Sequence, residues 1–426
     1  MAPGMSILLP YTYESPADLR IYSSGQGVYL YTNDGREVID GLSGSMNANL
    51  GHGNVAVAAA MHEQALGLTS LPSIAGDVSE ASIALADRLT RIMGVPDSAC
   101  VFTSSGSEAT EAALAAVWKY WSDIGCPGKY KILSLDGSYH GCTLGALALT
   151  GRAEEHVDVA PTAPNFRLPL PAWDPGDASC VSGSLERVLA SEHPERIAAI
   201  FLEPVMGLAG MVPAPGNDIR KVVEICRAND ILVVLDEALT GLGRAGHVTA
   251  ARLYGIEPDV LLVSKGLGCG FVSLAATCLG PRIASVLQYA SPTLRHGHTA
   301  SGNPLASRVA CTVLDELDAR GAYANAARMG DTFRYLMSAV LPALRREYTL
   351  RAIGLCLAIE TDDPAFAQEV RRSAYILGLR IRAIDRNIIV CPPLTITPHE
   401  ITQLVDRLSR ALADAEQSRT VGEVEE

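Results

Sequence analysis

An acidic residue and a lysine stand directly after two short apolar segments near the middle of the chain. Asp236 follows the run Ile231–Leu235, and Lys265 follows Val260–Val263 after a single serine. A lysine amine can form a Schiff base with a carbonyl group, and a carboxylate can keep a ring nitrogen protonated. Either residue alone is commonplace, because aspartate favours turns and helix caps and a lysine after a strand is usually solvated. The residues around the pair must therefore decide whether it is catalytic.

The stretch from Ile231 to Gly270 contains several short motifs in a fixed order. They are Asp-Glu at 236–237, Thr-Gly-x-Gly-Arg-x-Gly at 240–246, Pro-Asp at 258–259 and Ser-Lys-Gly-Leu at 264–267. This order resembles the pattern of class III (subgroup II) aminotransferases of fold type I, which depend on pyridoxal 5′-phosphate (PLP). A long ordered pattern is far more specific than a single short motif.

The resemblance implies a role for each member of the pair. Lys265 is expected to hold PLP as a Schiff base and, once released by substrate, to move a proton between substrate and cofactor. Asp236 is expected to pair with the pyridine nitrogen, so that the ring can accept electrons. The implied activity is that of an aminotransferase. It would move an amino group from an amine or ω-amino donor to a keto acid or aldehyde acceptor, in a ping-pong cycle between the pyridoxal and pyridoxamine forms of the cofactor.

A second group of residues could bind a phosphate. Ser105, Gly106 and Ser107 follow an apolar run and open a helical pattern, and a helix N-terminus offers free N–H groups to an anion. By itself this sequence is an ordinary helix cap. The resemblance makes it the site of the cofactor phosphate, and it matches Thr299 to a threonine that reaches the same phosphate from the partner subunit. A homodimer with shared active sites is therefore expected.

Other positions match residues that surround the cofactor ring in the family. The resemblance places Tyr139 on one face of the ring, with Ala238 opposite, where the family usually has valine. Glu203 belongs to the hydrogen-bond network near the ring. We interpret His140 as a structural neighbour and not as a proton carrier.

The substrate side of the site is less well specified. Family members that act on ornithine-like or γ-aminobutyrate-like donors carry a glutamate and an arginine where this chain has Leu208 and Ile389. The sequence Glu-Pro-Val-Met-Gly at 203–207 resembles ω-amine and pyruvate-type members instead. Arg382 matches an arginine that such members place in the substrate pocket, where it could clamp a carboxylate, although a surface arginine is the alternative. Met46 stands where many of them have tryptophan, which indicates a differently shaped pocket.

The elements that must position these residues follow an α/β pattern with a mainly parallel sheet. Short apolar runs alternate with helical patterns, and in such sheets ligands lie beyond the carboxyl ends of the strands. The runs expected to be strands are 99–102, 131–135, 198–202, 231–235, 260–263 and 275–279. Residues 161–175, rich in proline, are expected to form a surface excursion. We expect a large PLP-binding domain over 51–304 and a smaller α+β domain built from 1–50 and 305–426.

Composition excludes several other classes of protein. The formal net charge of −13 is unfavourable for binding nucleic acid or anionic membranes. Apolar stretches are interrupted by charged residues, so no membrane span is expected. The ten cysteines lack the spacing of a metal site, and no metal is expected. We found no signal peptide and expect a cytoplasmic protein.

Two alternatives remain at this level. A racemase, aminomutase or decarboxylase of the same fold would share Lys265 and Asp236, because these reactions differ in pocket side chains. A cofactor-free binding protein on this fold is the alternative of a different class, and the joint presence of the lysine, the aspartate and the phosphate-site residues argues against it.

Overall fold

A central sheet of seven strands organises the larger part of the molecule. The computed structural model describes residues 9–11, 19–74, 76–157, 166–290 and 293–422. The strand order is β4-β12-β11-β10-β7-β5-β6, and only β12 runs antiparallel to its neighbours. The strands are β4 (Ala99–Thr103), β5 (Lys131–Leu135), β6 (Arg167–Leu170), β7 (Ile197–Leu202), β10 (Leu232–Asp236), β11 (Val260–Val263) and β12 (Ala275–Leu279). All strands except β12 therefore send their carboxyl ends to one edge of the sheet.

Helices cover both faces of this sheet, which explains why its strands read as continuous apolar runs. In β10, Leu232 and Val234 pack with α4 (Gly106–Asp123) in one hydrophobic cluster, whereas Val233 and Leu235 belong to the cluster on the opposite face. The other helices of this part are α2 (Val55–Leu66), α3 (Glu80–Met93), α5 (Leu144–Leu149), α6 (Cys180–Ser191), α7 (Gly216–Ala228), α8 (Ala250–Tyr254) and α9 (Pro281–Ser285).

Several short elements complete the loops of the large part. The hairpin β8 (Val205–Met206) and β9 (Val212–Pro213) follows β7. The short helical turns are η2 (Ala153–His156), η3 (Pro194–Arg196), η4 (Lys265–Leu267) and η5 (Val286–Ala290).

The second part of the molecule joins the two ends of the chain. The sheet β1-β2-β3-β15 combines β1 (Tyr22–Gln26), β2 (Tyr29–Thr32) and β3 (Glu37–Asp40) with the late strand β15 (Leu379–Arg380). A further sheet has the order β13-β14-β17-β16, with β13 (Thr349–Ile353), β14 (Cys356–Glu360), β16 (Arg382–Ile384) and β17 (Asn387–Val390). The remaining elements are α1 (Ser43–Met46), α10 (Pro304–Ala319), α11 (Ala322–Val340), η6 (Leu341–Ala343), α12 (Pro364–Ile376) and α13 (Pro398–Gly422).

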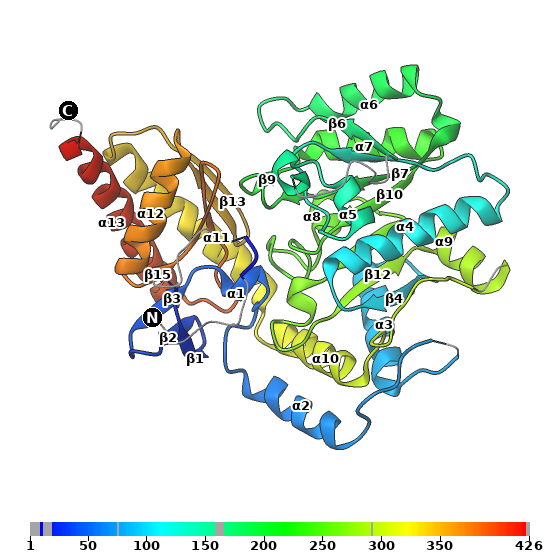
Figure 1. The fold of residues 1–426 in the computed structure, drawn as a ribbon, viewed down its shortest axis with the longest axis horizontal. Helices are drawn as coiled ribbons and strands as arrows, with labels where there is room; N and C mark the ends of the chain where they lie inside the picture. The colour runs from blue at the N-terminus through cyan, green and yellow to red at the C-terminus, as the bar shows by residue number, and fades with distance from the viewer. Residues whose placement is uncertain (1–8, 12–18, 75, 158–165, 291–292, 423–426) are drawn as a thin grey trace.

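Figure 1 shows these N-terminal strands beside β15, α12 and α13, on the opposite side of the molecule from α6 and α7. Helix α10 packs against α2 and α3 and so connects the two parts. The expected division near residues 50 and 304 stays a prediction. No helix in the described ranges is long and apolar enough to cross a membrane.

The expected α/β fold class is confirmed, and each expected strand is present to within one residue at either end. One expectation was wrong. The sequence predicts a surface excursion over 161–175, but its residues Arg167–Leu170 form β6, which pairs in parallel with β5 at the edge of the sheet. Pro169 weakens the strand signal in the sequence, because proline is uncommon in strands. It is tolerated in β6 because β6 is an edge strand, which pairs only with β5. Residues 161–165 lie outside the described residues.

Candidate active site

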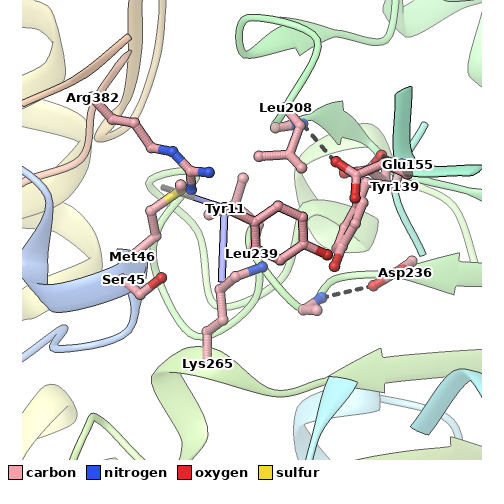
Figure 2. A pocket seen from close by; sticks show the side chains of 13 residues that line it. Tyr11, Ser45, Met46, Tyr139, Glu155, Leu208, Asp236, Leu239, Lys265 and Arg382 are labelled. Atoms are coloured by element: carbon pink, nitrogen blue, oxygen red, sulfur yellow. Dashed lines mark hydrogen bonds between the residues drawn. The ribbon is translucent and has the colours of Figure 1, made fainter. Parts of the chain in front are cut away.

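A cavity of about 280 Å³ lies at the carboxyl ends of the central strands, where the second part of the molecule meets the sheet. Its walls come from widely separated segments of the chain. They are formed by Tyr11, Ser45, Met46, Tyr139, Glu155, Glu203, Gly207, Leu208, Asp236, Ala238, Leu239, Lys265 and Arg382. Figure 2 shows the Lys265 side chain rising into this space from below and the Arg382 guanidinium entering it from the other side.

Asp236 and Lys265 reach the cavity because their strands are neighbours. Strands β10 and β11 pair in parallel, with Asp236 beside Leu262, and Lys265 begins η4 two residues after β11 ends. Asp236 is only 7% exposed. Its Oδ1 accepts a hydrogen bond from the backbone N–H of Ala238 at 3.0 Å, and its Oδ2 lies 2.8 Å from Nδ1 of His140. The carboxylate is thus held in one orientation beside the amine-bearing residue.

His140 is more closely connected to the site than the sequence suggested. Its ring is buried, packs edge-on against Phe201 at 5.9 Å between ring centres, and donates from Nδ1 to Asp236. The other ring nitrogen, Nε2, is buried and has no hydrogen-bond partner within the described ranges. An imidazole in this position fixes the carboxylate of Asp236 and supports its negative charge, which is the role of a positioning residue. The structure gives His140 a defined contact with Asp236, and its interpretation as a structural neighbour stays a prediction.

Glu203 is the second buried acid beside the cavity. Its carboxylate accepts hydrogen bonds from the backbone N–H groups of Tyr139 at 2.7 Å and Gly207 at 3.2 Å. Burial raises the pKa of Glu203 to about 7, and the nearby charge of Asp236 adds to the shift, whereas His140 and the two N–H donors oppose it. The carboxyl group therefore fixes the Tyr139 backbone at the cavity and can exist in either protonation state near neutral pH.

The N-terminus of α4 lies beside the ends of β10 and β11. Ser105 caps the helix by accepting a hydrogen bond from the N–H of Glu108 at 3.2 Å. A Cβ atom on Gly106 would lie 3.6 Å from Ser264 Oγ and 3.7 Å from Ala238 Cβ, so this glycine touches the segment that carries Lys265. Ser107 Oγ accepts the N–H of Cys142 at 3.0 Å. The first N–H groups of a helix have no acceptor within it, so this end of the cavity offers donors for an anion.

Thr299 lies on an exposed loop and does not line the cavity. The adjacent His298 brings its Nε2 to 3.5 Å from Glu108 in the first turn of α4. The loop thus runs close to the phosphate-site candidates of its own chain. The expected contact of Thr299 with a partner subunit concerns a second chain and stays a prediction.

The opposite wall is shaped by an unusual backbone turn at α1. Ser43 and Met46 have positive φ values of 44° and 61°, which side chains other than glycine rarely adopt. The buried carboxylate of Asp40 holds this turn by accepting N–H groups of Leu42 and Gly44. The Met46 side chain, 5% exposed, lines the cavity as a result.

Arg244 connects this turn to the rest of the molecule. The side chain is fully buried and donates to Ser43 Oγ at 2.9 Å, to Asn49 Oδ1 at 2.8 Å and to the carbonyl of Pro392 at 2.5 Å. The arginine of the Thr-Gly-x-Gly-Arg motif therefore ties the large part to both ends of the chain. Its contribution to the site is indirect, through the position of the α1 turn.

Arg382 begins β16 and pairs directly with Ile389 of β17. Ile389 is buried in an apolar cluster with Met46 and Leu239, whereas the Arg382 guanidinium lines the cavity. Burial lowers the pKa of Arg382, and no salt bridge to it exists among the described residues. The cation of this wall is thus supplied by β16, whereas Ile389 of β17 lies in the apolar cluster and not among the residues that line the cavity.

A buried arginine links the two sides of the cavity mouth. Arg152, 8% exposed, donates to the carbonyl of Leu208 at 2.9 Å and approaches Asp385 at 3.2 Å. Asp385 lies in the turn between β16 and β17, so this contact helps to hold the strand that carries Arg382.

The structure brings most of the predicted site residues together. Seven of them line the cavity: Met46, Tyr139, Glu203, Asp236, Ala238, Lys265 and Arg382. Ser105, Gly106 and Ser107 lie next to this group at the α4 N-terminus, and Thr299 lies farther along the surface. Sequence reasoning missed Tyr11, Ser45, Glu155 and Leu239. Their local sequences contain no motif, and only the folded chain places them at the cavity. No cluster of metal-ligating side chains occurs in the described part of the chain.

These features define the class of protein: an α/β enzyme with a lysine and an oriented aspartate at adjacent strand ends and, beside them, a helix end that offers N–H donors. The model of the class III aminotransferase family matches residues 12–412. The diaminobutyrate–2-oxoglutarate transaminase of Halomonas elongata is 30% identical over 422 residues, which cover 92% of this chain and 90% of that protein. The mitochondrial γ-aminobutyrate transaminase 1 of Oryza sativa subsp. indica is 30% identical, over 97% of this chain and 86% of that protein.

Solved structures agree with this assignment. An amine transaminase from an uncultivated Pseudomonas species, in its PLP-bound form, superposes with a TM-score of 0.93 at 29% identity and covers 97% of this chain and 99% of that one. An (S)-enantioselective ω-transaminase from Thermomicrobium roseum gives a TM-score of 0.89 at 31% identity, with 93% of each chain covered. The chain belongs to the class III aminotransferases and is a PLP-dependent transaminase of fold type I.

The residues present fit the cofactor of this family. PLP needs an amine for its aldehyde, an acid for its ring nitrogen and N–H donors for its phosphate. Lys265 lines the cavity, Asp236 is held there by His140, and the α4 N-terminus abuts both strand ends at Gly106. The described residues therefore supply each kind of group that PLP needs: an amine, an acid and N–H donors.

Proposed function

We propose that this transaminase takes its amino group from an amine or ω-amino donor and passes it to a keto acid whose carboxylate binds Arg382. One observation supports this most directly: Lys265, Asp236 and Arg382 line the same cavity. Transamination needs the Lys265 amine at the reacting carbon of the substrate. The Arg382 guanidinium lies elsewhere in the cavity and can select a substrate that carries a carboxylate.

We assign the following roles around the cofactor. When bound, PLP supplies an aldehyde carbon and an electron-withdrawing ring. The Lys265 amine would bind the cofactor covalently and afterwards move the proton at the reacting carbon. Asp236, fixed by His140, would keep the ring nitrogen protonated. Tyr139 would lie against one face of the ring and Ala238 against the other, and Glu203 would hold the Tyr139 backbone.

The phosphate would bind at the N-terminus of α4, through the N–H groups and hydroxyls of Ser105, Gly106 and Ser107. We further propose a homodimer in which the partner subunit's Thr299 completes this phosphate site. The exposure of Thr299 and the position of its loop near α4 support that arrangement.

We also propose a cytoplasmic location. All ten cysteines are free thiols, which supports a reducing compartment.

The substrate side of the proposal depends on three positions. Leu208 lines the cavity where γ-aminobutyrate-type members carry a glutamate, and Ile389 contributes no charge. Arg382, one strand away, is the cation available for a carboxylate. The site is therefore closer in chemistry to amine and pyruvate-type transaminases, although two of the relatives described above act on diaminobutyrate and γ-aminobutyrate.

The proposal is tested by separating the two half-reactions. The PLP-loaded enzyme is mixed with a donor alone, either a plain amine or an ω-amino acid, and the visible absorbance of the bound cofactor is followed. Absorbance should fall with donor alone and return on addition of pyruvate. A donor panel that leaves the absorbance unchanged, or recovery with aldehydes but never with a keto acid, would contradict the proposal.

A further inference from the structure

The wall of the cavity between Lys265 and Arg382 is formed by a turn with unfavourable backbone geometry. Ser45 and Met46 of α1 line this wall, and Figure 2 shows them along one side of the cavity, with Arg382 above and Lys265 below. Met46 has a φ of 61°, and Gly44 combines a φ of 69° with a ψ of −110°. Such conformations cost free energy and persist only where the surrounding structure enforces them. The contacts that hold the turn therefore decide the shape of this wall.

Arg380 binds this turn from a neighbouring strand. Its Nη1 donates to the carbonyl oxygen of Gly44 at 2.7 Å and to Oδ1 of Asp40 at 2.8 Å. Strand β15 pairs in parallel with β3, and Arg380 lies directly opposite Asp40 in this pairing. The backbones are also close here, since a Cβ atom on Gly41 would lie 2.7 Å from the carbonyl oxygen of Arg380. Arg380 thus connects the residue that precedes the turn to a carbonyl group inside it.

Asp40 is a fully buried carboxylate that depends on its neighbours for compensation. It accepts the N–H groups of Leu42 and Gly44, and its Oδ2 lies 2.9 Å from Nε2 of His52. Burial acts to raise the pKa of Asp40, but the hydrogen bond with His52 and the charge of Arg380 outweigh it, and the pKa is lowered. A buried charge that loses a partner is costly. Loss of the Arg380 cation would therefore weaken the hold of Asp40 on the turn.

Arg380 and Arg382 differ in what they bind. Side chains two residues apart in an extended segment point to the same side. Ile381, between them, is 3% exposed and belongs to the hydrophobic core. Arg380 is paired with Asp40, whereas Arg382 lines the cavity and has no salt bridge among the described residues. One short segment therefore supplies the cation of the cavity and the cation that supports the wall beside it.

We infer that Arg380 is a positioning residue that controls which amine donors fit the cavity. By binding Gly44 and Asp40 it fixes the α1 turn, and with it the wall against which the substituents of a donor pack. Arg380 is not among the residues that line the cavity, so its removal should change the selection between donors and not the chemical step. The inference deepens the proposed function and rests on it, because it concerns the amine donor of the same cavity.

Hydrogen exchange of the backbone tests whether Arg380 holds the turn. Mass spectrometry follows peptides that cover residues 41–48. Arg380→Met removes the charge and the donors but keeps a long side chain, and exchange in this segment should become at least about tenfold faster. Arg380→Lys keeps a cation for Asp40 and should stay within about threefold of wild type. Arg407→Met is the matched control, because Arg407 donates to the carbonyl oxygen of Gly378 at 2.6 Å, at the other end of β15.

The second readout is the ratio of kcat/KM between the two enantiomers of 1-phenylethylamine, measured with the PLP-loaded enzyme and pyruvate. The phenyl and methyl groups of this amine differ in size, so the ratio reports how the wall selects between two orientations. The fraction of folded enzyme cancels, because both enantiomers are assayed on one preparation. The ratio should change by at least about fivefold in Arg380→Met and by less than about twofold in Arg380→Lys and Arg407→Met. Asp40→Asn should change both readouts in the same direction as Arg380→Met, and it takes the place of that variant if Arg380→Met does not fold.

Three results would overturn the inference. The first is unchanged exchange over residues 41–48 in Arg380→Met and Asp40→Asn. The second is faster exchange with an unchanged enantiomer ratio, and the third is an equal change of both readouts in Arg407→Met. If the wild type converts neither enantiomer nor any other plain amine, the proposed donor class fails, and the exchange measurement still decides whether Arg380 fixes the turn.

Discussion

Replacing Arg382 by alanine is the most informative test of how this enzyme recognises its acceptor. The guanidinium is partly buried, lines the cavity and has no salt-bridge partner in the described part of the chain. A carboxylate about 4 Å away, at an effective dielectric constant of about 20, would gain about 4 kcal/mol from this charge before desolvation is subtracted. The cost of removing two hydration shells reduces the net value, and we expect about 2 to 3 kcal/mol.

This value corresponds to a fall of about 30- to 150-fold in kcat/KM for pyruvate. An aldehyde acceptor without a carboxylate should be affected by less than about twofold, because it never contacts the guanidinium. Both acceptors are assayed with the same plain amine donor, so that only the second half-reaction differs. Arg386→Ala is the matched control, since Arg386 lies in the following turn, is exposed and pairs with Glu360 at 2.5 Å outside the cavity.

Two results would refute the reasoning. An equal loss with pyruvate and with the aldehyde would mean that Arg382 supports the wall of the cavity and does not bind a carboxylate. Unchanged kinetics with both acceptors would place carboxylate recognition elsewhere and would leave the substrate argument without its cation.

Three further predictions follow from the site. Lys265→Ala should abolish turnover in a standard assay while PLP still binds non-covalently, and activity above a few per cent without an added amine would contradict the role of Lys265. Asp236→Asn should retain PLP but lose at least about 100-fold in kcat, because an amide cannot hold a ring nitrogen protonated; near wild-type kcat would exclude this pairing. Burial raises the pKa of Glu203 to about 7 from 4.5, so its protonated form contributes stability that is present below pH 4.5 and is lost as the pH rises through 7. The melting temperature of Glu203→Gln minus that of wild type should therefore increase from about pH 5 to pH 8, and a constant difference would show that the pKa is not raised.

The core of the sheet was predictable because its strands are short, continuous apolar runs, which favour buried strands. Val260–Val263 and Ala275–Leu279 formed strands with the bounds expected of them. The exception, β6, contains the exposed Pro169 and two half-buried residues, Arg167 and Leu168, so pairing with β5 and not composition makes it a strand. Edge strands depend on their neighbour in this way because one of their sides makes no ladder hydrogen bonds.

By itself, the sequence determined that an acid and a lysine follow adjacent buried strands and that a serine- and glycine-rich segment opens a helix. Those are local facts: Asp236, Lys265 and Gly106 take their positions from the strand or helix next to them, and parallel strands bring their ends to one edge. Tertiary structure alone decided what surrounds them. Tyr11, Glu155 and Arg382 meet at one cavity from segments more than a hundred residues apart, and Met46 enters it only because Asp40 and Arg244 hold a strained turn. Such contacts depend on packing between distant segments, and no local pattern of residue types records them.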